Sequence, residues 1–179
     1  MRVEQEDDEM RIILDGMGGD NAPAAVVEGA VLAMKEMPHE IVFVGQEEVI
    51  REELKKYKYN EAQVSIVDAR EVISNDEAPV RAVRSKKDSS IVKGINMVKN
   101  GEGDIFISAG STGALLSGGL FILGRIQGID RPALACIYPI VGGRASLLVD
   151  AGANSECKPN NLLEFGIMGN LYMEKVIGR

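Results

Sequence analysis

Histidine, cysteine and tryptophan are rare or missing in this sequence of 179 residues, and their scarcity limits the chemistry it can carry. It has no tryptophan and one histidine, and its two cysteines, Cys136 and Cys157, lack the spacing of metal ligands. The histidine, His39, follows a proline at the expected end of a helix, so no base is in view for a Ser–His or Cys–His nucleophile. We therefore expect no metal site, no cofactor and no covalent catalysis by such a pair. Reduced thiols are typical of an intracellular protein.

Long apolar runs are also missing. None reaches the roughly 18 residues of a membrane-spanning helix, and the acidic N-terminus is unlike a secretory signal. The formal net charge is -7, but residues 1–9 hold five acids and one base, a net of -4 that leaves -3 for the rest. We expect residues 1–9 to form a flexible acidic tail and residues 10–179 to form the fold.

Short apolar runs alternate with longer amphipathic ones, which is the pattern of an α/β fold. Strands are predicted at 10–15, 40–44, 64–68 and 104–108, the last as the clearest buried strand. Helices are predicted at 24–37, 46–58 and 112–124, and a further helix is expected to be capped by Asp88 or Ser89. This alternation predicts a mostly parallel sheet covered on both faces. Strands at 133–140 and 145–150, joined by VGGR, could form an antiparallel arm, and a last helix is predicted at 160–176.

A glycine-rich segment, DGMGGDN at 15–21, follows the first strand at its carboxyl end, where open α/β sheets bind ligands. Its glycines allow a ligand close to the backbone, but it is neither GxGxxG nor a phosphate-binding loop with a lysine. The candidate binding residues are Asp15, Gly18, Gly19 and Asn21. A tight turn without a ligand is an equal alternative, and Asp20 or Asn21 is expected to cap the next helix.

A second such segment, SAGSTGA at 108–114, stands between the strand at 104–108 and a helix. Hydroxyls, glycines and free backbone N–H groups suit a phosphate or an oxyanion. The alternative is that Ser111 or Thr112 is only a helix cap. The candidate residues are Ser108, Gly110, Ser111, Thr112 and Gly113.

Two further segments carry candidate residues. Four bases occur in the seven residues of RAVRSKK at 81–87, and Arg81, Arg84 and Lys87 could hold a phosphate or an acidic protein. A solvated loop is the alternative for this segment. LVDAGAN at 148–154 brings Asp150 and Asn154 to a strand end, whereas Cys157 is expected to be a bystander.

Together these segments resemble the phosphate acyltransferase family called PlsX. The resemblance covers Met10 to about Gly178 and lies in five ordered blocks: DGMGGDNAP, APVRAVRSKKDSS, ISAGSTGALL, GIDRPALA and LLVDAGANSECKPNNLLEFGIMGNLY. Gly16 stands where family members often have alanine, and Ser111 where they often have asparagine. Family members are about twice as long, so the chain resembles their N-terminal portion, whether as a fragment, a truncation or the product of a split gene.

The resemblance implies a three-layer α/β/α sandwich of the isocitrate/isopropylmalate dehydrogenase and phosphotransacetylase type, here truncated. It also implies that phosphate attacks the thioester of acyl carrier protein, giving acyl-phosphate for phospholipid synthesis. We assign the chemistry to Ser108, Ser111, Thr112, Asp150 and Asn154, and substrate binding to the other candidates, because all four segments are expected at strand ends on one sheet edge. The implied setting is a cytoplasmic homodimer with transient peripheral membrane contact and no nucleic acid.

Two other functions remain open: a phosphotransacetylase-like enzyme that uses acyl-CoA, and a non-catalytic fragment that binds the carrier protein. A dehydrogenase is disfavoured, because no nucleotide fingerprint is present. We expect the parent enzyme to be active and this chain alone to be inactive, because its cleft would lack groups from the remaining length.

Overall fold

The computed structural model describes residues 9–178 and places them in two compact units, one ending at Leu123 and one beginning at Gly124. Of the predicted acidic tail at 1–9, only Glu9 lies within the described residues.

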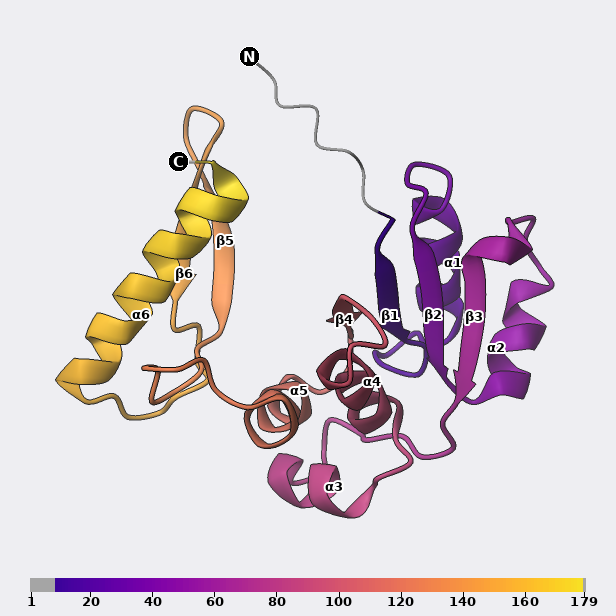
Figure 1. The fold of residues 1–179 in the computed structure, drawn as a ribbon, viewed down its shortest axis with the longest axis horizontal. Coiled ribbons are helices and arrows are strands. Elements are labelled where there is room, and N and C mark those ends of the chain that lie inside the picture. Colours follow the sequence, from indigo (N-terminus) through magenta and orange to yellow (C-terminus); the bar gives the residue numbers. More distant parts are fainter. Residues whose placement is uncertain (1–8, 179) are drawn as a thin grey trace. The chain divides into compact units, whose positions relative to one another are not determined.

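The first unit is a parallel sheet with helices on both faces (Figure 1). Its strands are β1 (Arg11–Asp15), β2 (Glu40–Gly45), β3 (Val64–Asp68) and β4 (Ile105–Ile107), in the order β3-β2-β1-β4. Its helices are α1 (Ala24–Ala33), α2 (Glu47–Leu54), α3 (Pro79–Ser85), α4 (Ser90–Lys99) and α5 (Thr112–Gly118), with the short turns η1 (Glu61–Gln63) and η2 (Gly119–Leu123). The predicted α/β class and parallel strands are confirmed.

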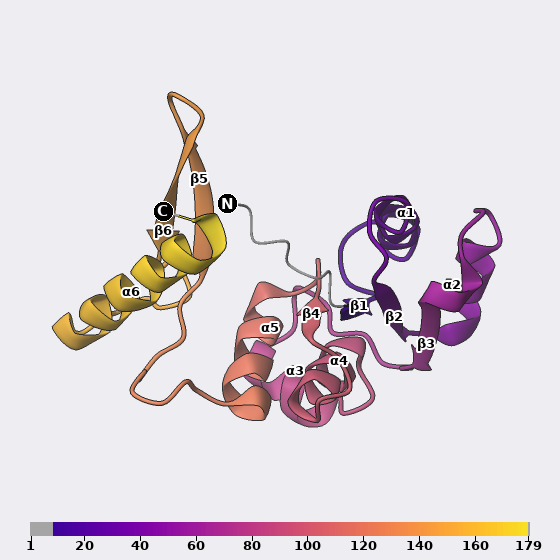
Figure 2. The same ribbon diagram turned by 45° about the horizontal axis from the view of Figure 1, so that its top comes forward.

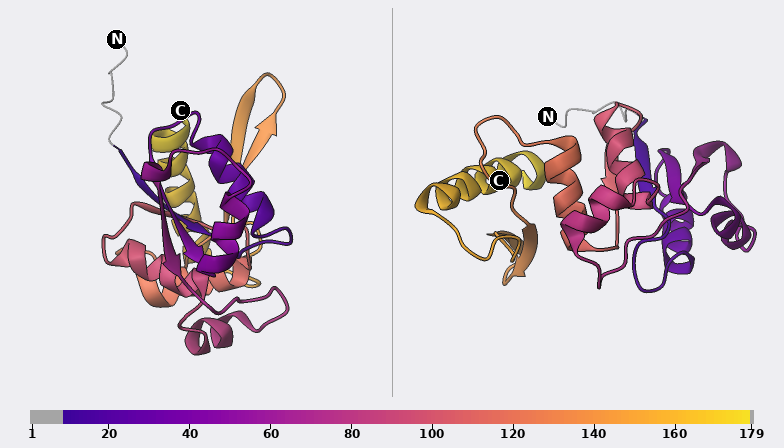
Figure 3. Two further views of the ribbon diagram at one scale, coloured as in Figure 1. Left: turned by 90° about the vertical axis from the view of Figure 1, so that its right-hand side faces the viewer. Right: turned by 90° about the horizontal axis from the view of Figure 1, so that it is seen from below.

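Each face of this sheet is covered by its own helices. Helices α1 and α2 pack on one face through a cluster that includes Val31, Phe43 and Ile50. Helix α4 packs on the other face through Ile13, Val42 and Met97, among others (Figures 2 and 3). Helices α3 and α5 lie against α4 through a third cluster. The strands are therefore apolar on both faces, as parallel strands between helix layers must be.

The second unit is an antiparallel hairpin with one long helix. Strands β5 (Ala135–Ile140) and β6 (Arg144–Val149) pair from Ala135 with Val149 to Ile140 with Arg144, which confirms the predicted antiparallel pair. Gly142 and Gly143 have φ values of 90° and 70°, the left-handed conformation that glycine adopts without strain in a tight hairpin turn. Helix α6 (Pro159–Tyr172) packs along β6 and continues into η3 (Met173–Ile177).

Several predicted details are wrong. Helix α1 ends at Ala33 rather than near 37, and neither Asp20 nor Asn21 caps it with a side chain, because Pro23 is at the cap position. Residues 79–85 form a helix, α3, where a loop was one alternative. Strand β4 is not buried: Ile105 and Ile107 are each 45% exposed, because β4 pairs only with β1 within the described residues.

Candidate functional site

The carboxyl ends of the four parallel strands share one edge of the sheet. Asp15, Gly45 and Asp68 end β1, β2 and β3, and Ser108 follows β4. Strands β1 and β4 are neighbours, with Leu14 paired to Ile107, so the two predicted glycine-rich segments lie side by side. The expectation that a parallel sheet brings them together is confirmed. His39 precedes β2 and therefore lies at the opposite edge, where its Nδ1 accepts a hydrogen bond from the Met10 N–H.

Asp15 joins the two segments through its carboxylate. Its Oδ2 accepts a hydrogen bond from the Ser108 hydroxyl at 2.7 Å, and its Oδ1 accepts one from the Met17 N–H at 3.1 Å. The Ser108 oxygen in turn accepts from the Gly110 N–H at 3.0 Å. Asp15 is almost fully buried, and a buried carboxylate needs such donors. Because Ser108 has a single hydroxyl proton and gives it to Asp15, Ser108 positions the loop here rather than donating to a ligand.

Glycine is required where the two segments touch. A Cβ at Gly18 would lie 2.4 Å from Asp15 Oδ2 and 2.9 Å from the Gly110 nitrogen. A Cβ at Gly110 would lie 3.2 Å from the Gly18 Cα. Gly19 has a φ of 103°, which side chains rarely adopt. The glycines of both segments therefore serve their contact with each other, which supports the tight-turn alternative for their geometry.

Two hydroxyls begin α5. The Ser111 Oγ accepts a hydrogen bond from the Ala114 N–H at 3.3 Å, so Ser111 is the helix cap that the sequence allowed. As a cap it accepts, and its own proton stays available for a further acceptor. Thr112 is exposed. Gly113 lies beneath α3, since a Cβ there would come within 2.6 Å of Pro79 Cγ. Ser111 and Thr112 are thus the hydroxyls that could donate to an anion.

The four bases of the third segment differ in what they contact. Lys86 Nζ pairs with Glu77 at 2.6 Å and bonds the Val72 carbonyl at 2.7 Å. Lys87 Nζ donates to the Val83 carbonyl at 3.2 Å. Arg81 and Arg84 are exposed, and the Arg84 guanidinium lies 5.2 Å from the centre of the Phe121 ring.

Asp150 and Asn154 lie in the second unit, and the expectation that Asp150 ends a strand of the parallel sheet is wrong. Asp150 follows β6 of the antiparallel hairpin. Its carboxylate accepts from the backbone N–H groups of Leu134 (2.8 Å) and Asn154 (2.7 Å) and from the Asn154 side chain (3.0 Å), among others. Burial raises the pKa of the Asp150 carboxyl, but these hydrogen bonds outweigh it and hold that pKa below its usual value. Asp150 therefore closes the base of the hairpin.

Asn21 is exposed, and its backbone carbonyl accepts from the Ala25 N–H at 3.0 Å. Beside it, an open and mostly apolar groove of about 520 Å³ runs between α1 and the strands β1 and β4. Asp15, Gly18 and Ser108 form its polar end. The predicted residues Asp15, Gly18, Gly19, Asn21 and Ser108 thus share one concave surface.

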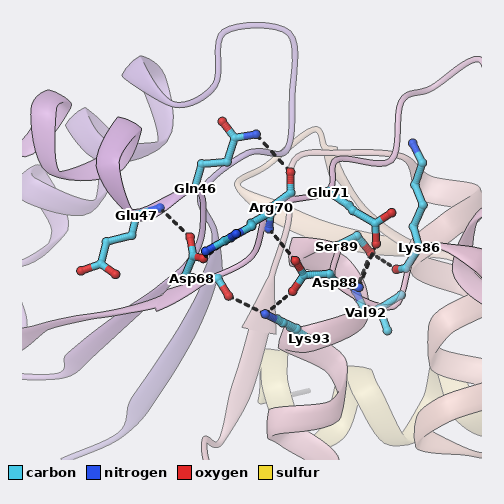
Figure 4. Close-up of polar contacts among 10 residues, drawn as sticks. All are labelled: Gln46, Glu47, Asp68, Arg70, Glu71, Lys86, Asp88, Ser89, Val92 and Lys93. Atoms are coloured by element: carbon cyan, nitrogen blue, oxygen red, sulfur yellow. Dashed lines mark hydrogen bonds and ion pairs between the residues drawn. The ribbon is translucent and has the colours of Figure 1, made fainter.

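A polar network at the ends of β2 and β3 was not predicted (Figure 4). Asp68 accepts from the Glu47 N–H at 3.2 Å and from Arg70 Nε at 3.1 Å, which lowers its pKa. Lys93 of α4 donates to the Asp68 carbonyl and pairs with Asp88. Hydrogen bonds from Lys93 and from the Arg70 N–H lower the pKa of Asp88. Asp68 ends a strand as Asp15 does, so an acidic residue at the end of an apolar run could have predicted it. The contacts of this network, however, hold α4 against the sheet, which is a structural role.

Within residues 9–178 no group of three or more histidine, cysteine, aspartate or glutamate side chains could hold a metal ion. In the same range no helix is long and apolar enough to cross a membrane.

Comparison with known proteins places this geometry in a family. Residues 10–179 match the family model described as "Fatty acid synthesis protein". The chain is 54% identical to a phosphate acyltransferase of Alkaliphilus oremlandii over 168 residues, which are 94% of this chain and 50% of that protein. It is 50% identical to a phosphate acyltransferase of Clostridioides difficile over 169 residues, again 94% of this chain and 50% of that protein.

Among solved structures, a phosphotransacetylase from Streptococcus pyogenes superposes with a TM-score of 0.64 at 21% identity, covering 89% of this chain and 52% of that one. This likeness supports the predicted phosphotransacetylase-like fold. The chain spans about half the length of the relatives named above. It belongs to the fatty acid synthesis protein family, the PlsX family of phosphate acyltransferases that its sequence resembles.

Proposed function

We propose that this chain is part of an acyltransferase that moves a fatty acyl group from acyl carrier protein to inorganic phosphate. The observation that carries the proposal is the family match, because it spans every described element from β1 to α6. The joined loops of β1 and β4 support it, since Asp15, Gly18 and Ser108 form the polar end of an apolar groove, and Ser111 and Thr112 follow Ser108 in the same loop.

The reaction needs no activated side chain as nucleophile. A phosphate oxygen attacks the thioester carbonyl carbon, a C–O bond forms, and the C–S bond breaks. The thiolate of the carrier leaves and takes the proton of the hydrogen phosphate, so acyl-phosphate and a free thiol result. The protein has to hold two anionic partners together and stabilise the oxyanion between them.

Each candidate takes a role that its contacts allow. Ser111 and Thr112 donate hydroxyl protons to phosphate or the oxyanion, whereas Asp15 and Ser108 are positioning residues that fix their loop. The glycines at 18, 19, 110 and 113 let the segments pack. Arg81, Arg84 and Lys87 supply positive charge. Asp150 and Asn154 close the base of the hairpin in the second unit, and their part in the reaction is proposed from the family resemblance.

The test is phosphate-dependent release of the carrier thiol. It uses this chain joined to the part of the A. oremlandii protein that it does not cover, with that full-length relative as the assay control. We expect thiol release from acyl carrier protein that requires phosphate and is much faster than release from acyl-CoA of equal chain length. Faster use of acyl-CoA would favour the phosphotransacetylase-like alternative, and binding without release would favour the carrier-binding alternative.

A single substitution tests the assigned hydroxyl. Thr112→Val keeps the shape of an exposed side chain and removes its donor. We expect kcat/KM for phosphate to fall at least about tenfold with an unchanged urea midpoint. Ser146→Ala, which also removes an exposed hydroxyl, is the matched control and should leave both unchanged. Wild-type kinetics in Thr112→Val would remove Thr112 from the site.

The family resemblance also leads us to propose a cytoplasmic homodimer with transient membrane contact. Sedimentation velocity and vesicle flotation of the same joined protein test these two properties. A monomer at micromolar concentration, or no flotation with anionic vesicles, would contradict the respective part.

A further inference from the structure

An exposed surface on α3 and η2 combines two guanidinium groups, neither of which forms an ion pair within residues 9–178, with apolar side chains. It consists of Val80, Arg81, Arg84 and Phe121, and we call it the α3 patch. Val80 and Arg84 are four residues apart on α3 and so lie on one helix face. Arg84 joins this face to η2 by its contact with the Phe121 ring. Phe121 is 50% exposed and Val80 is 42% exposed. The α3 patch is therefore continuous across two elements.

Arg81 and Arg84, the cations of the α3 patch, form no ion pair that stabilises the fold among residues 9–178. The two lysines that follow are occupied: Lys86 with Glu77, and Lys87 with a carbonyl at the end of α3. The formal net charge of the chain is -7, and two neighbouring exposed arginines without a carboxylate partner in the described part of the chain are a local concentration of positive charge. Free charge of this kind steers a partner of opposite sign.

We propose that the α3 patch is the docking surface for the acidic carrier protein, and that Arg81 and Arg84 bind its carboxylates while Phe121 and Val80 pack on its apolar side chains. The inference rests on the proposed function. On this inference the basic segment binds the carrier and not phosphate. The guanidinium of Arg84 lies over the exposed ring of Phe121 rather than in the loops of β1 and β4. Arginine beside an aromatic ring is typical of the centre of a protein interface.

The composition of the α3 patch favours a protein partner over a lipid surface. Recognition of anionic membranes generally uses clusters of about four to eight lysines or arginines, and only two free guanidinium groups are present here. The planar guanidinium pairs with a carboxylate through two parallel hydrogen bonds, which the acidic side chains of the carrier can accept. The exposed area of Phe121 and Val80 then supplies a salt-independent part of the affinity.

The experiment measures binding of this chain to acyl carrier protein carrying a fluorophore, by anisotropy at about 50 mM and 300 mM salt. The variants are Arg81→Glu, Arg84→Glu and Phe121→Ala. Lys58→Glu changes the net charge equally at an exposed position beyond α2 and is the matched control. We expect each arginine reversal to raise Kd at least about tenfold at low salt and less at high salt. Phe121→Ala should raise Kd about threefold at both.

Folding and the competing ligands are tested in the same series. Arg84→Lys keeps the charge but lacks the planar fork, so its Kd should rise less than that of Arg84→Glu. A loss in Arg84→Glu cannot be ascribed to unfolding if both variants share the wild-type urea midpoint. Kd values in the arginine reversals equal to that of Lys58→Glu would overturn the inference. Displacement of the carrier by millimolar phosphate, or loss of binding to phosphatidylglycerol vesicles but not to the carrier, would also overturn it.

Failure of the α3 patch as a docking surface can be told apart from failure of the proposed function. If the wild-type chain binds the carrier and the arginine reversals bind it equally well, the α3 patch is wrong while the acyltransferase stands. If the joined protein binds the carrier but releases no thiol, the acyltransferase is wrong, and the arginine reversals alone decide whether the α3 patch binds the carrier.

Discussion

Asp15 is the residue on which the contact between the two glycine-rich segments depends. Its two carboxylate oxygens bond Met17 in its own loop and Ser108 in the other. A buried carboxylate held by a hydroxyl and a backbone N–H is a stable anchor only while both donors keep their positions. The glycine at 18 permits this arrangement, because no side chain fits between Asp15 and Gly110. The geometry near Ser111 and Thr112 therefore depends on a residue without a side chain.

A pair of glycine substitutions tests this point. In Gly18→Ala the new methyl would meet Asp15 Oδ2 and the Gly110 nitrogen, so we expect the free energy of unfolding to fall by about 1–3 kcal/mol. In Gly29→Ala the methyl would meet nothing within 4 Å in the interior of α1, so stability should rise by about 0.5–1 kcal/mol. Urea unfolding measures both. Equal urea midpoints for the two variants would show that the loops of β1 and β4 can move apart without loss of folding free energy.

At the scale of elements, the β5–β6 hairpin is closed at its base by one carboxylate. Asp150 follows β6 and bonds the Leu134 N–H just before β5. Its other bonds fix residues 153 and 154, which lead towards α6. The hairpin and the loop that leads to α6 are thus connected through a single titratable group.

The stability of this hairpin should depend on pH in a defined direction. Hydrogen bonds hold the pKa of Asp150 below its usual value despite burial. The stabilisation is therefore fully present above the unfolded pKa of about 3.9, and is lost as pH falls through the lower folded value. Asp150→Asn should destabilise the chain at pH 7 and destabilise it less at about pH 3, below the unfolded pKa. Urea unfolding at both values measures this, with Asp130→Asn as the control. A pH-independent difference would contradict it.

The strands and the hairpin turn could be predicted from the sequence, whereas the short helix α3 could not. The apolar runs predicted all four parallel strands, and the double glycine of the hairpin predicted its turn. Helix α3 was missed because it is short and buries only Ala82 and Val83, so its apolar pattern covers less than two turns. Its stability comes from packing on α5, which a local pattern cannot reveal. The contact of Arg84 with Phe121 depends on that packing.

The candidate site was partly predictable for a similar reason. Both Asp15 and Ser108 stand at the carboxyl end of an apolar run, so their loops could be expected on one edge of the sheet. That β1 and β4 are adjacent is a property of the strand order, which no local pattern contains. The exposure of Ile107 was not predictable either, because an apolar run indicates only that a strand can be buried.

At the scale of the whole molecule, the two units differ in how much apolar surface they bury. The three hydrophobic clusters of the described residues all lie in the first unit. In the second unit Phe165 is the large apolar side chain that is fully covered, whereas Val141 is 95% exposed and Leu163 is also open to solvent. A small unit that buries so little apolar surface gains little free energy from folding.

We therefore expect the two units to differ in local stability. In hydrogen exchange at pH 7, amides of β1 and β2 should exchange only through global unfolding, and amides of β5 and β6 at least about a hundredfold faster. The chain can be joined to the half of the A. oremlandii protein that it does not match. If that half packs on the apolar side chains of β5 and β6, their amides should exchange more slowly, whereas exchange in β1 and β2 should not change. Equal protection of both units in the chain alone would mean that the hairpin and α6 are stabilised by more than their own contacts. The low apolar burial of the second unit would then be the wrong basis for ranking the local stability of the two units.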